Sequence, residues 1–174
     1  MAKLFIQELP SREEIHKTAS ELHAGVEMDA WVLHSNLLFM KVATELEMKL
    51  DSLLSEYQLS SGRFTLLFIL RNSPEGLMPS VLAQKVGVTQ ATISGLLNSL
   101  EKANLIVRET HQRDGRSFVI KLTEKGDSTI KEIFPRWYPF IQSFWGQFAD
   151  DEKSNLDRLL ERMIHTTTLQ KAEQ

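Results

Sequence analysis

Apolar positions recur at every third or fourth residue along most of the chain, and this spacing predicts a mainly helical protein. Ser60 and Thr89 each precede such a pattern and suit the N-cap position, where a side-chain oxygen accepts a hydrogen bond from an unpaired backbone amide. Pro79 suits the first turn of a helix, because the amide that proline lacks has no partner there. Helices are therefore expected before residue 104 at about 11–25, 27–57, 61–72, 80–86 and 89–103.

The spacing of apolar residues changes after Leu105, from a helical period to a period of two. Successive side chains of a strand point to opposite faces, so at 106–111 one face would carry Ile106, Arg108 and Thr110 and the other Val107, Glu109 and His111. At 118–122 one face would carry Phe118, Ile120 and Leu122 and the other Val119 and Lys121. Asp114 and Gly115 stand between the two runs, and this pair favours a tight turn. The two runs therefore predict an antiparallel β-hairpin.

Two further helices are expected in the C-terminal third of the chain. Thr123 opens the first of them, and Pro135 and Pro139 lie inside it. Each proline removes a backbone donor and clashes with the preceding turn, so a kink or break is expected there. The last helix is expected to begin at Asp150 or Asp151, because carboxylates suit a helix N-terminus. The apolar face that it is expected to bury consists of Leu156, Leu159, Leu160, Met163 and Ile164.

The segment VLAQKVGVTQATISGLLNSL, residues 81–100, combines a short helix, a turn and a second helix. Ala83 stands where the two helices cross, and only a small side chain allows a close approach. Gly87 falls in the turn, where a positive φ is expected. These features are typical of a helix-turn-helix, and the hairpin that follows extends it to a winged helix-turn-helix. The inner face of the second helix is formed by Ile93, Leu96, Leu97 and Leu100.

The outward face of this second helix carries short polar side chains and small methyl groups. Such groups suit the DNA major groove, where glutamine pairs with adenine and threonine or alanine touches the thymine methyl group. An ordinary solvated face is the alternative, but it would usually be richer in Lys and Glu. Gly95 costs about 1 kcal/mol relative to alanine in mid-helix, which predicts that something, inside the protein or outside it, needs the space that glycine leaves. The candidate base-reading residues are Thr89, Gln90, Ala91, Thr92, Ser94, Gly95 and Asn98.

Charge is unevenly distributed along the chain. The 174 residues carry a net charge of −3 at pH 7, whereas residues 78–125 hold seven Lys and Arg against four Asp and Glu, a local charge of +3. A basic segment in an acidic chain indicates a localised anionic partner. Arginine fits a narrow minor groove, where the negative potential is strongest. The hairpin tip supplies the candidate DNA contacts Arg113, Asp114, Arg116 and Ser117, with Asp114 bracing an arginine or capping the turn.

Other classes of function find little support in the residues. The chain has no cysteine, no secretory signal pattern at its N-terminus and no apolar run of the ~20 residues that span a bilayer, so a soluble cytoplasmic protein is expected. Its five histidines are scattered and no catalytic motif is present, so no enzyme activity, metal site or cofactor is expected. The alternative to a DNA-binding regulator is a winged-helix module whose basic hairpin binds an acidic protein partner.

Residues 60–126 resemble the MarR (multiple-antibiotic-resistance regulator) family of bacterial transcription factors. The resemblance is carried by LSSGRFTLLFIL, by VLAQKVGVTQATISGLLNSLEKANLI and above all by RDGRSFVIKLTEKG. It implies a mainly α fold with a small β-hairpin wing. In this fold a winged helix-turn-helix DNA-binding domain at 60–123 is flanked by dimerisation helices at 1–59 and 124–174.

The resemblance further implies a homodimer that represses transcription from a pseudo-palindromic operator of double-stranded DNA and is released by a small aromatic or other organic effector. Arg116 would then enter the minor groove, with Asp114 positioning it, while the helix from Thr89 reads bases. The chain departs from the family pattern in several places: many relatives carry an arginine in place of Gly95, a serine or threonine cap is common in place of Met78, and Pro135 and Pro139 interrupt a helix that relatives often keep continuous, so a differently shaped dimer arm is expected. Because the arginine at position 95 is absent, weaker anchoring of the second helix of the helix-turn-helix to the DNA backbone is expected.

The resemblance also places an effector cleft between the dimer arm and the winged domain. Aromatic and apolar walls with a few polar anchors suit such a pocket. The alternative is that these aromatic side chains form the core or the dimer contact. Thr65 stands where the urate-responsive branch tends to carry an acidic residue, so urate is not the expected ligand. The candidate pocket residues are Trp31, His34 and Leu38 on one helical face, Phe64, Phe68 and Arg71 on another, and Thr65.

Overall fold

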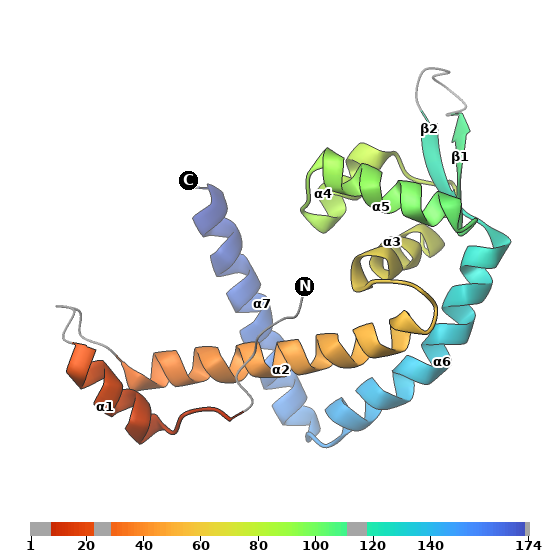
Figure 1. The fold of residues 1–174 in the computed structure, drawn as a ribbon. Helices are drawn as coiled ribbons and strands as arrows, with labels where there is room; N and C mark the ends of the chain where they lie inside the picture. Colours follow the sequence, from red (N-terminus) through yellow and green to blue (C-terminus); the bar gives the residue numbers. More distant parts are fainter. Residues whose placement is uncertain (1–7, 23–28, 111–117, 173–174) are drawn as a thin grey trace. The chain divides into compact units, whose positions relative to one another are not determined.

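The computed structural model describes residues 8–22, 29–110 and 118–172 (Figure 1). The chain divides into two compact units, Met1–Thr129 and Ile130–Gln174. The helices and strands of the described ranges are α1 (Arg12–Leu22), α2 (Ala30–Ser55), α3 (Ser61–Arg71), α4 (Pro79–Val86), α5 (Gln90–Lys102), β1 (Ile106–Thr110), β2 (Phe118–Leu122), α6 (Glu124–Gly146) and α7 (Asp150–Ala172). This order of elements confirms the expected fold class. The domain boundaries expected between residues 59 and 60 and between residues 123 and 124 stay a prediction.

Side-chain caps fix where helices of the first unit begin. The Ser60 hydroxyl accepts a hydrogen bond from the Arg63 amide at 3.5 Å, which confirms Ser60 as the cap of α3. Asp29 caps α2 by accepting a hydrogen bond from the Trp31 amide at 2.8 Å, so α2 begins later than the apolar spacing indicated. Met78 precedes α4 and makes no side-chain cap bond. Local polar residues therefore set these boundaries more closely than apolar spacing does.

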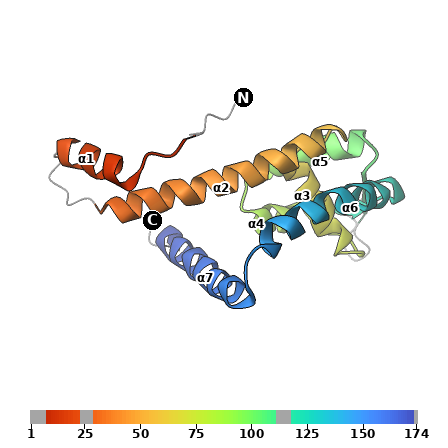
Figure 2. The same ribbon diagram turned by 90° about the horizontal axis from the view of Figure 1, so that it is seen from below.

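The core of the first unit gathers around α3. This helix packs against α2, α5 and β2, and Figure 2 shows it beside the C-terminal half of α2. Burial of a large aliphatic side chain contributes about 1.5–3 kcal/mol to stability, so these contacts hold the helix-turn-helix in place. The fully buried side chains of this unit are Leu54, Leu66, Leu67, Leu70, Leu82, Ile93, Leu97, Leu100 and Ile120.

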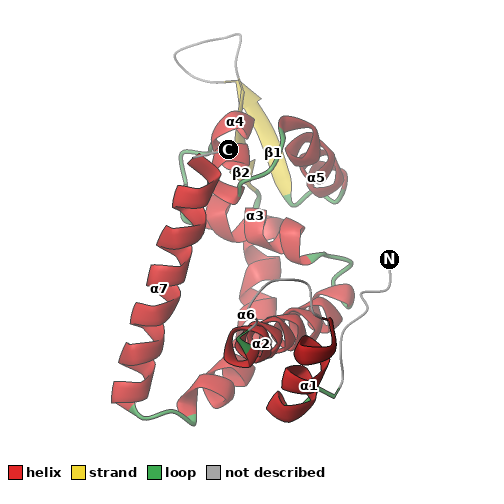
Figure 3. Ribbon diagram, turned by 90° about the vertical axis from the view of Figure 1, so that its left-hand side faces the viewer, coloured by secondary structure: helices red, strands yellow, loops and turns green. Residues whose placement is uncertain are grey.

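β1 and β2 form the expected antiparallel hairpin, in the register that sets Arg108 opposite Ile120. Figure 3 shows the two strands side by side. Leu77, in the connection between α3 and α4, pairs with Ile120 through two backbone hydrogen bonds of 2.8 and 3.0 Å. The hairpin is therefore tied to this connection as well as to the end of α5. The tip of the hairpin, residues 111–117, lies outside the described residues.

Thr123 opens α6, as expected, at a close junction between the hairpin and the helix. The Gly126 amide donates to the Thr123 hydroxyl at 3.0 Å, and this hydroxyl donates to the Asn104 carbonyl at 2.8 Å. Gly126 is buried, and a Cβ there would meet the Leu105 carbonyl oxygen and lie 2.7 Å from Leu122 Cδ1. Glycine therefore allows the first turn of α6 to pack directly against the backbone at Leu105.

α6 runs through both of its prolines, which lie in the second unit. The chain stays helical past Pro135 and Pro139 to Gly146, so of the expected kink or break the break is wrong, while the kink stays a prediction. Both prolines are exposed, and the carbonyls that lose their amide partners can therefore be hydrated. Aromatic pairs one turn apart also support the helix, with the Phe134 and Tyr138 rings stacked at 5.5 Å between centroids.

α7 begins at Asp150, as expected, and the Ala149 amide donates to the Glu152 carboxylate at 2.8 Å. Its apolar face is less covered than expected. The second unit contains only α7 and the C-terminal part of α6, which is too little to bury that face, so the expected burial is wrong for the single chain. The half-buried side chains are Leu156 and Leu160, and the exposed ones are Leu159, Met163 and Ile164.

Candidate nucleic-acid interface

The candidate base-reading residues share one exposed face of α5. Ile93, Leu97 and Leu100 are at most 1% exposed and hold the opposite face in the core. Ala83 is buried where α4 packs against α5, and Gly87 ends α4 with a φ of 68°, as the turn requires. The residues brought together on the outer face are Thr89, Gln90, Ala91, Thr92, Ser94, Gly95 and Asn98. Their role as DNA contacts stays a prediction.

Local hydrogen bonds decide which groups of this face are available to a ligand. The Thr89 hydroxyl accepts a hydrogen bond from the Thr92 amide at 3.2 Å and thereby caps α5. The Ser94 hydroxyl donates to the Gln90 carbonyl at 2.8 Å, within the helix. In the described part of the chain, no hydrogen bond engages the side-chain amide of Gln90. Gln90 is therefore well placed to pair with a base edge.

The cap of α5 yields a test of how this helix is held. Thr89→Ala is expected to lower the free energy of unfolding by about 1 kcal/mol, because the first turn loses its cap. Ser94→Ala is the matched control, since its hydroxyl bonds only to a carbonyl inside the helix and alanine is the better helix former. Urea unfolding followed by far-UV circular dichroism measures both, and equal losses of stability would contradict the capping role.

Gly95 lies exposed at the centre of this face. A Cβ at this position would have no neighbouring atom of the described chain within 4 Å. The described part of the chain therefore does not need the space, although glycine costs about 1 kcal/mol in mid-helix. This geometry favours a partner surface that approaches the α5 backbone from outside the chain.

Arg108 joins the base of the hairpin to α5, a role that the sequence did not indicate. Its Nη2 donates to Asn98 Oδ1 at 2.6 Å, and its Nε lies 3.3 Å from Glu101 Oε2. The guanidinium also lies over the Phe118 ring, 5.3 Å from the centroid. Arg108 therefore holds α5 and the hairpin together and engages Asn98 Oδ1, an acceptor of one of the candidate base-reading residues. The alternation of side chains along the two strands sets Arg108 and Phe118 on one face of the hairpin. This alternation was the signal in the sequence that could have indicated their contact.

The cations in the described part of the hairpin are paired with carboxylates. Lys121 Nζ lies 2.9 Å from Glu109 Oε2, and the hydrogen bond to this carboxylate raises the pKa of Lys121. Arg108 forms an ion pair with Glu101. The positive charge that the hairpin can offer a partner therefore depends on its tip. The candidate tip residues Arg113, Asp114, Arg116 and Ser117 lie outside the described residues and stay predictions.

The candidate effector residues are divided between two helices. On α2, Trp31 and Leu38 are exposed, whereas His34 is half-buried and its Nδ1 has no hydrogen-bond partner among the described residues. On α3, Phe64 is buried and Phe68 is exposed. Across the described ranges, no hydrogen bond or ion pair links the α2 group to the α3 group. A pocket shared by the two groups stays a prediction.

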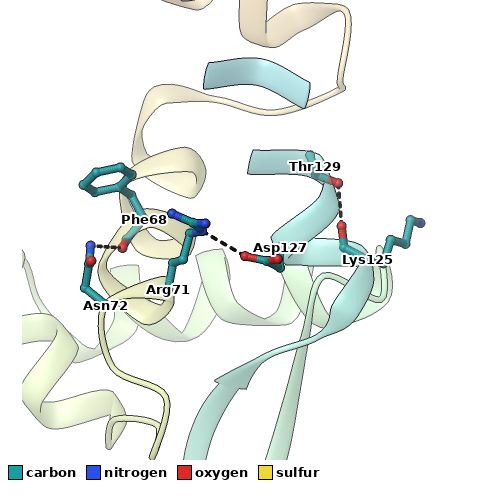
Figure 4. Close-up of polar contacts among 6 residues, drawn as sticks. All are labelled: Phe68, Arg71, Asn72, Lys125, Asp127 and Thr129. Atoms are coloured by element: carbon teal, nitrogen blue, oxygen red, sulfur yellow. Dashed lines mark hydrogen bonds and ion pairs between the residues drawn. The ribbon is translucent and has the colours of Figure 1, made fainter. Parts of the chain in front are cut away.

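Arg71, another candidate effector residue, is engaged by α6. Its Nε donates to Asp127 Oδ1 at 2.8 Å (Figure 4), and this ion pair fastens the first turn of α6 to α3. The Thr65 hydroxyl donates to the Ser61 carbonyl at 2.9 Å. Asp127 was missed because 56 positions separate it from Arg71 in the sequence. An anionic effector at Arg71 would have to compete with Asp127.

Metal binding and membrane insertion find no structural support within residues 8–22, 29–110 and 118–172. No three His, Asp or Glu side chains in these ranges lie close enough together to hold a metal ion. None of the helices described there combines the length and the apolar character needed to cross a bilayer.

Known proteins similar to this chain are transcriptional regulators. A family model described as the MarR family matches residues 57–117. The HTH-type transcriptional repressor YetL of Bacillus subtilis is 28% identical over 156 residues, which cover 89% of this chain and 92% of YetL. An uncharacterised HTH-type transcriptional regulator of Bacillus cereus is 30% identical over 115 residues, covering 66% of this chain and 76% of that regulator. The crystal structure of the S. aureus MepR–DNA complex matches with a TM-score of 0.69 and 24% identity over 75% of this chain and 96% of MepR.

Proposed function

The chain belongs to the MarR family, and on this premise we propose that it regulates transcription by binding double-stranded DNA in a sequence-specific way. α5 enters the major groove, and the hairpin tip reaches the flanking minor groove. The observation that carries the proposal is the outer face of α5, where short polar side chains surround the uncovered Gly95 while the opposite face is buried. MepR, a protein of the same fold, has been crystallised in complex with DNA, which supports this reading.

The proposed active form is a homodimer on a pseudo-palindromic operator. α2 carries large apolar side chains that the chain leaves uncovered, among them Trp31, Val32, Phe39 and Met40, each at least 53% exposed. Soluble monomers rarely leave so many large apolar side chains together in water, because a partner surface that covers them lowers the free energy. A second copy of the chain, with the same apolar helix, would supply that surface.

We further propose that the protein represses transcription and that a small organic effector releases it from its operator. YetL, which is similar over most of its length, is described as a repressor. Such a regulator needs no catalytic group and acts in the cytoplasm, where its DNA is. The alternative, a winged-helix module that binds an acidic protein, is not favoured, because the similar proteins are described as transcriptional regulators.

Fluorescence anisotropy on a duplex from upstream of the protein's own gene, measured across a salt series, tests the proposal. The logarithm of the affinity is expected to fall by about 0.9 per phosphate contact for each tenfold rise in salt. Arg116→Ala is expected to weaken specific binding about tenfold, because the minor groove loses an arginine. Arg12→Ala removes the same charge from the exposed surface of α1 and is expected to bind as the wild type does.

Three results together would contradict the assignment of this operator: no preference over a scrambled duplex, a shallow salt dependence, and equal affinities for the two arginine variants. Other genomic fragments would then be tested in the same way. A shallow salt dependence on every fragment would favour the acidic protein partner.

A further inference from the structure

The contact between Arg108 and Asn98 determines which end of the Asn98 amide faces outward. Arg108 Nη2 donates to Asn98 Oδ1 at 2.6 Å. A guanidinium carries donors and no acceptor, so only the oxygen of the asparagine amide can face it. Oxygen and nitrogen branch from the same carbon, so the Nδ2 group is the end that points away from Arg108. Asn98 therefore presents a donor to a partner, while its acceptor is already engaged.

Two further contacts hold the guanidinium of Arg108 in place. Its Nε lies 3.3 Å from Oε2 of Glu101, which follows Asn98 by one turn of α5. Its Cζ lies 5.3 Å from the centroid of the Phe118 ring on β2. These contacts restrict rotation of the guanidinium, and the Glu101 carboxylate offsets its charge. Arg108 is therefore held as a support for Asn98 and is less available to a DNA phosphate.

Asn98 lies on the outer face of α5, in line with residues proposed to read bases. Ala91, Ser94 and Asn98 follow one another at spacings of three and four residues, which places them along one side of the helix. Asn98 is exposed, and within the described ranges no hydrogen bond engages its Nδ2. Gly95, three residues earlier, has no side chain that would keep a DNA groove away from the helix. The short side chain of Asn98 can therefore reach a base edge.

The orientation of the amide decides which base edge it matches. Adenine offers the N7 acceptor beside the N6 donor, and an asparagine that is free to turn pairs with both. Guanine offers two acceptors, N7 and O6. Because Arg108 engages Oδ1, the Nδ2 donor of Asn98 matches guanine, whereas the N6 donor of adenine would be left without a partner.

We propose that Arg108 is a positioning residue for base recognition, which holds Asn98 as a donor and thereby selects guanine at the base pair that Asn98 meets. The inference rests on the proposed function. It adds one base of the operator and assigns the choice of that base to a residue of the hairpin. An Asn98 released from Arg108 would turn and pair with adenine through both ends of its amide.

Selection from a pool of DNA duplexes with a randomised central segment, carried out with the full chain, tests the proposal. Sequencing of the bound DNA gives the base preference of each variant at every position. Asn98→Ala identifies the base pair concerned, as the one where the preference is lost. The wild type is expected to favour guanine over adenine there by about fivefold or more, the lower range for a base contact. Arg108→Met keeps a long apolar side chain beside Phe118 but has no donor, and its preference is expected to shift to adenine.

Lys121→Met is the matched control for the loss of charge. Lys121 is also a hairpin cation paired with a carboxylate, but the strand register sets it on the face opposite to Arg108. Its base preferences are expected to equal those of the wild type, because a change of charge acts on all sequences alike. Adding Asn98→Ala to Arg108→Met is expected to abolish the adenine preference, since Asn98 is the residue that reads the base.

Asn98→Asp guards against a folding defect in Arg108→Met, because the carboxylate still accepts the hydrogen bond from Arg108. The group that faces outward becomes an acceptor, which matches the N4 donor of cytosine. The preference at the same base pair is therefore expected to shift from guanine to cytosine. A guanine preference that persists in Asn98→Asp would contradict the proposal.

The remaining outcomes separate this proposal from its alternatives. An unchanged preference in Arg108→Met would overturn it. Loss of guanine without a gain of adenine would also overturn it, since that result is expected if Arg108 itself contacted the base. Equal weakening by Asn98→Ala on all sequences would assign Asn98 to a phosphate and overturn it as well. A wild type that enriches no sequence would refute the proposed function itself, so the two failures are distinguishable.

Discussion

Gly126→Ala is expected to lower the free energy of unfolding by about 3 kcal/mol, the upper range for overpacking a core. The added Cβ would meet the Leu105 carbonyl oxygen and lie 2.7 Å from Leu122 Cδ1. A leucine methyl can rotate, but the Leu105 carbonyl is fixed by its hydrogen bond from the Thr123 amide at 3.1 Å. The first turn of α6 would therefore have to move away from the hairpin.

Gly62→Ala is the matched control, because it makes the same change in another helix of the first unit. A Cβ at Gly62 would lie 3.9 Å from Leu96 Cδ1, an ordinary van der Waals contact. Its stability should equal or exceed that of the wild type by up to about 1 kcal/mol, since alanine is favoured over glycine in helices. Urea unfolding followed by tryptophan fluorescence, at one protein concentration throughout, compares the three proteins. Coincident midpoints for the two variants would show that the junction at Gly126 tolerates a side chain.

Gly95→Glu is expected to weaken specific DNA binding about 100-fold while leaving the fold at least as stable as the wild type. Glutamate is a better helix former than glycine, and no neighbouring atom of the described chain occupies the space around Gly95. On DNA, however, the new carboxylate would stand in the groove between two phosphate backbones. Like charges brought together in an interface cost several kcal/mol, which corresponds to this loss of affinity.

Two variants separate the causes of that loss. Ser52→Glu makes the same change of charge on an exposed part of α2 and is expected to bind DNA within about threefold of the wild type at moderate salt. Gly95→Ala adds only a methyl group and reports how closely DNA approaches the helix backbone. Operator titrations by fluorescence anisotropy compare the four proteins. If Gly95→Glu bound as well as Ser52→Glu, the outer face of α5 would not be the surface that meets DNA.

The features predicted best from the sequence are those whose cause lies within four residues. Ser60 and Thr89 cap the helices that follow them, and Gly87 takes the left-handed conformation that its turn needs. Each depends on backbone geometry that neighbouring residues determine on their own. The hairpin was predicted for the same reason, because strand alternation and a turn pair are both local signals.

The features missed by the sequence depend on residues that meet only after folding. Arg63 contacts Ser99, which is 36 positions away, and Arg71 contacts Asp127 across 56 positions. Alternation placed Arg108 in a strand but could not show that its guanidinium reaches Asn98 on α5. Arg63 and Arg108 had no predicted role and Arg71 was predicted to line an effector pocket, whereas the structure gives each of them a partner on another element.

The pairing of Leu77 with Ile120 has a consequence for how this protein can evolve. Because the connection between α3 and α4 is bonded to β2, inserting or deleting a residue there would displace the hairpin relative to α5. Gly76 adds to this restriction, since its φ of 81° and a Cβ position 2.8 Å from the Ile120 carbonyl oxygen exclude a larger residue. A lineage that adapts to operators of different geometry would therefore keep the length of this loop and change the residues on the surface of α5.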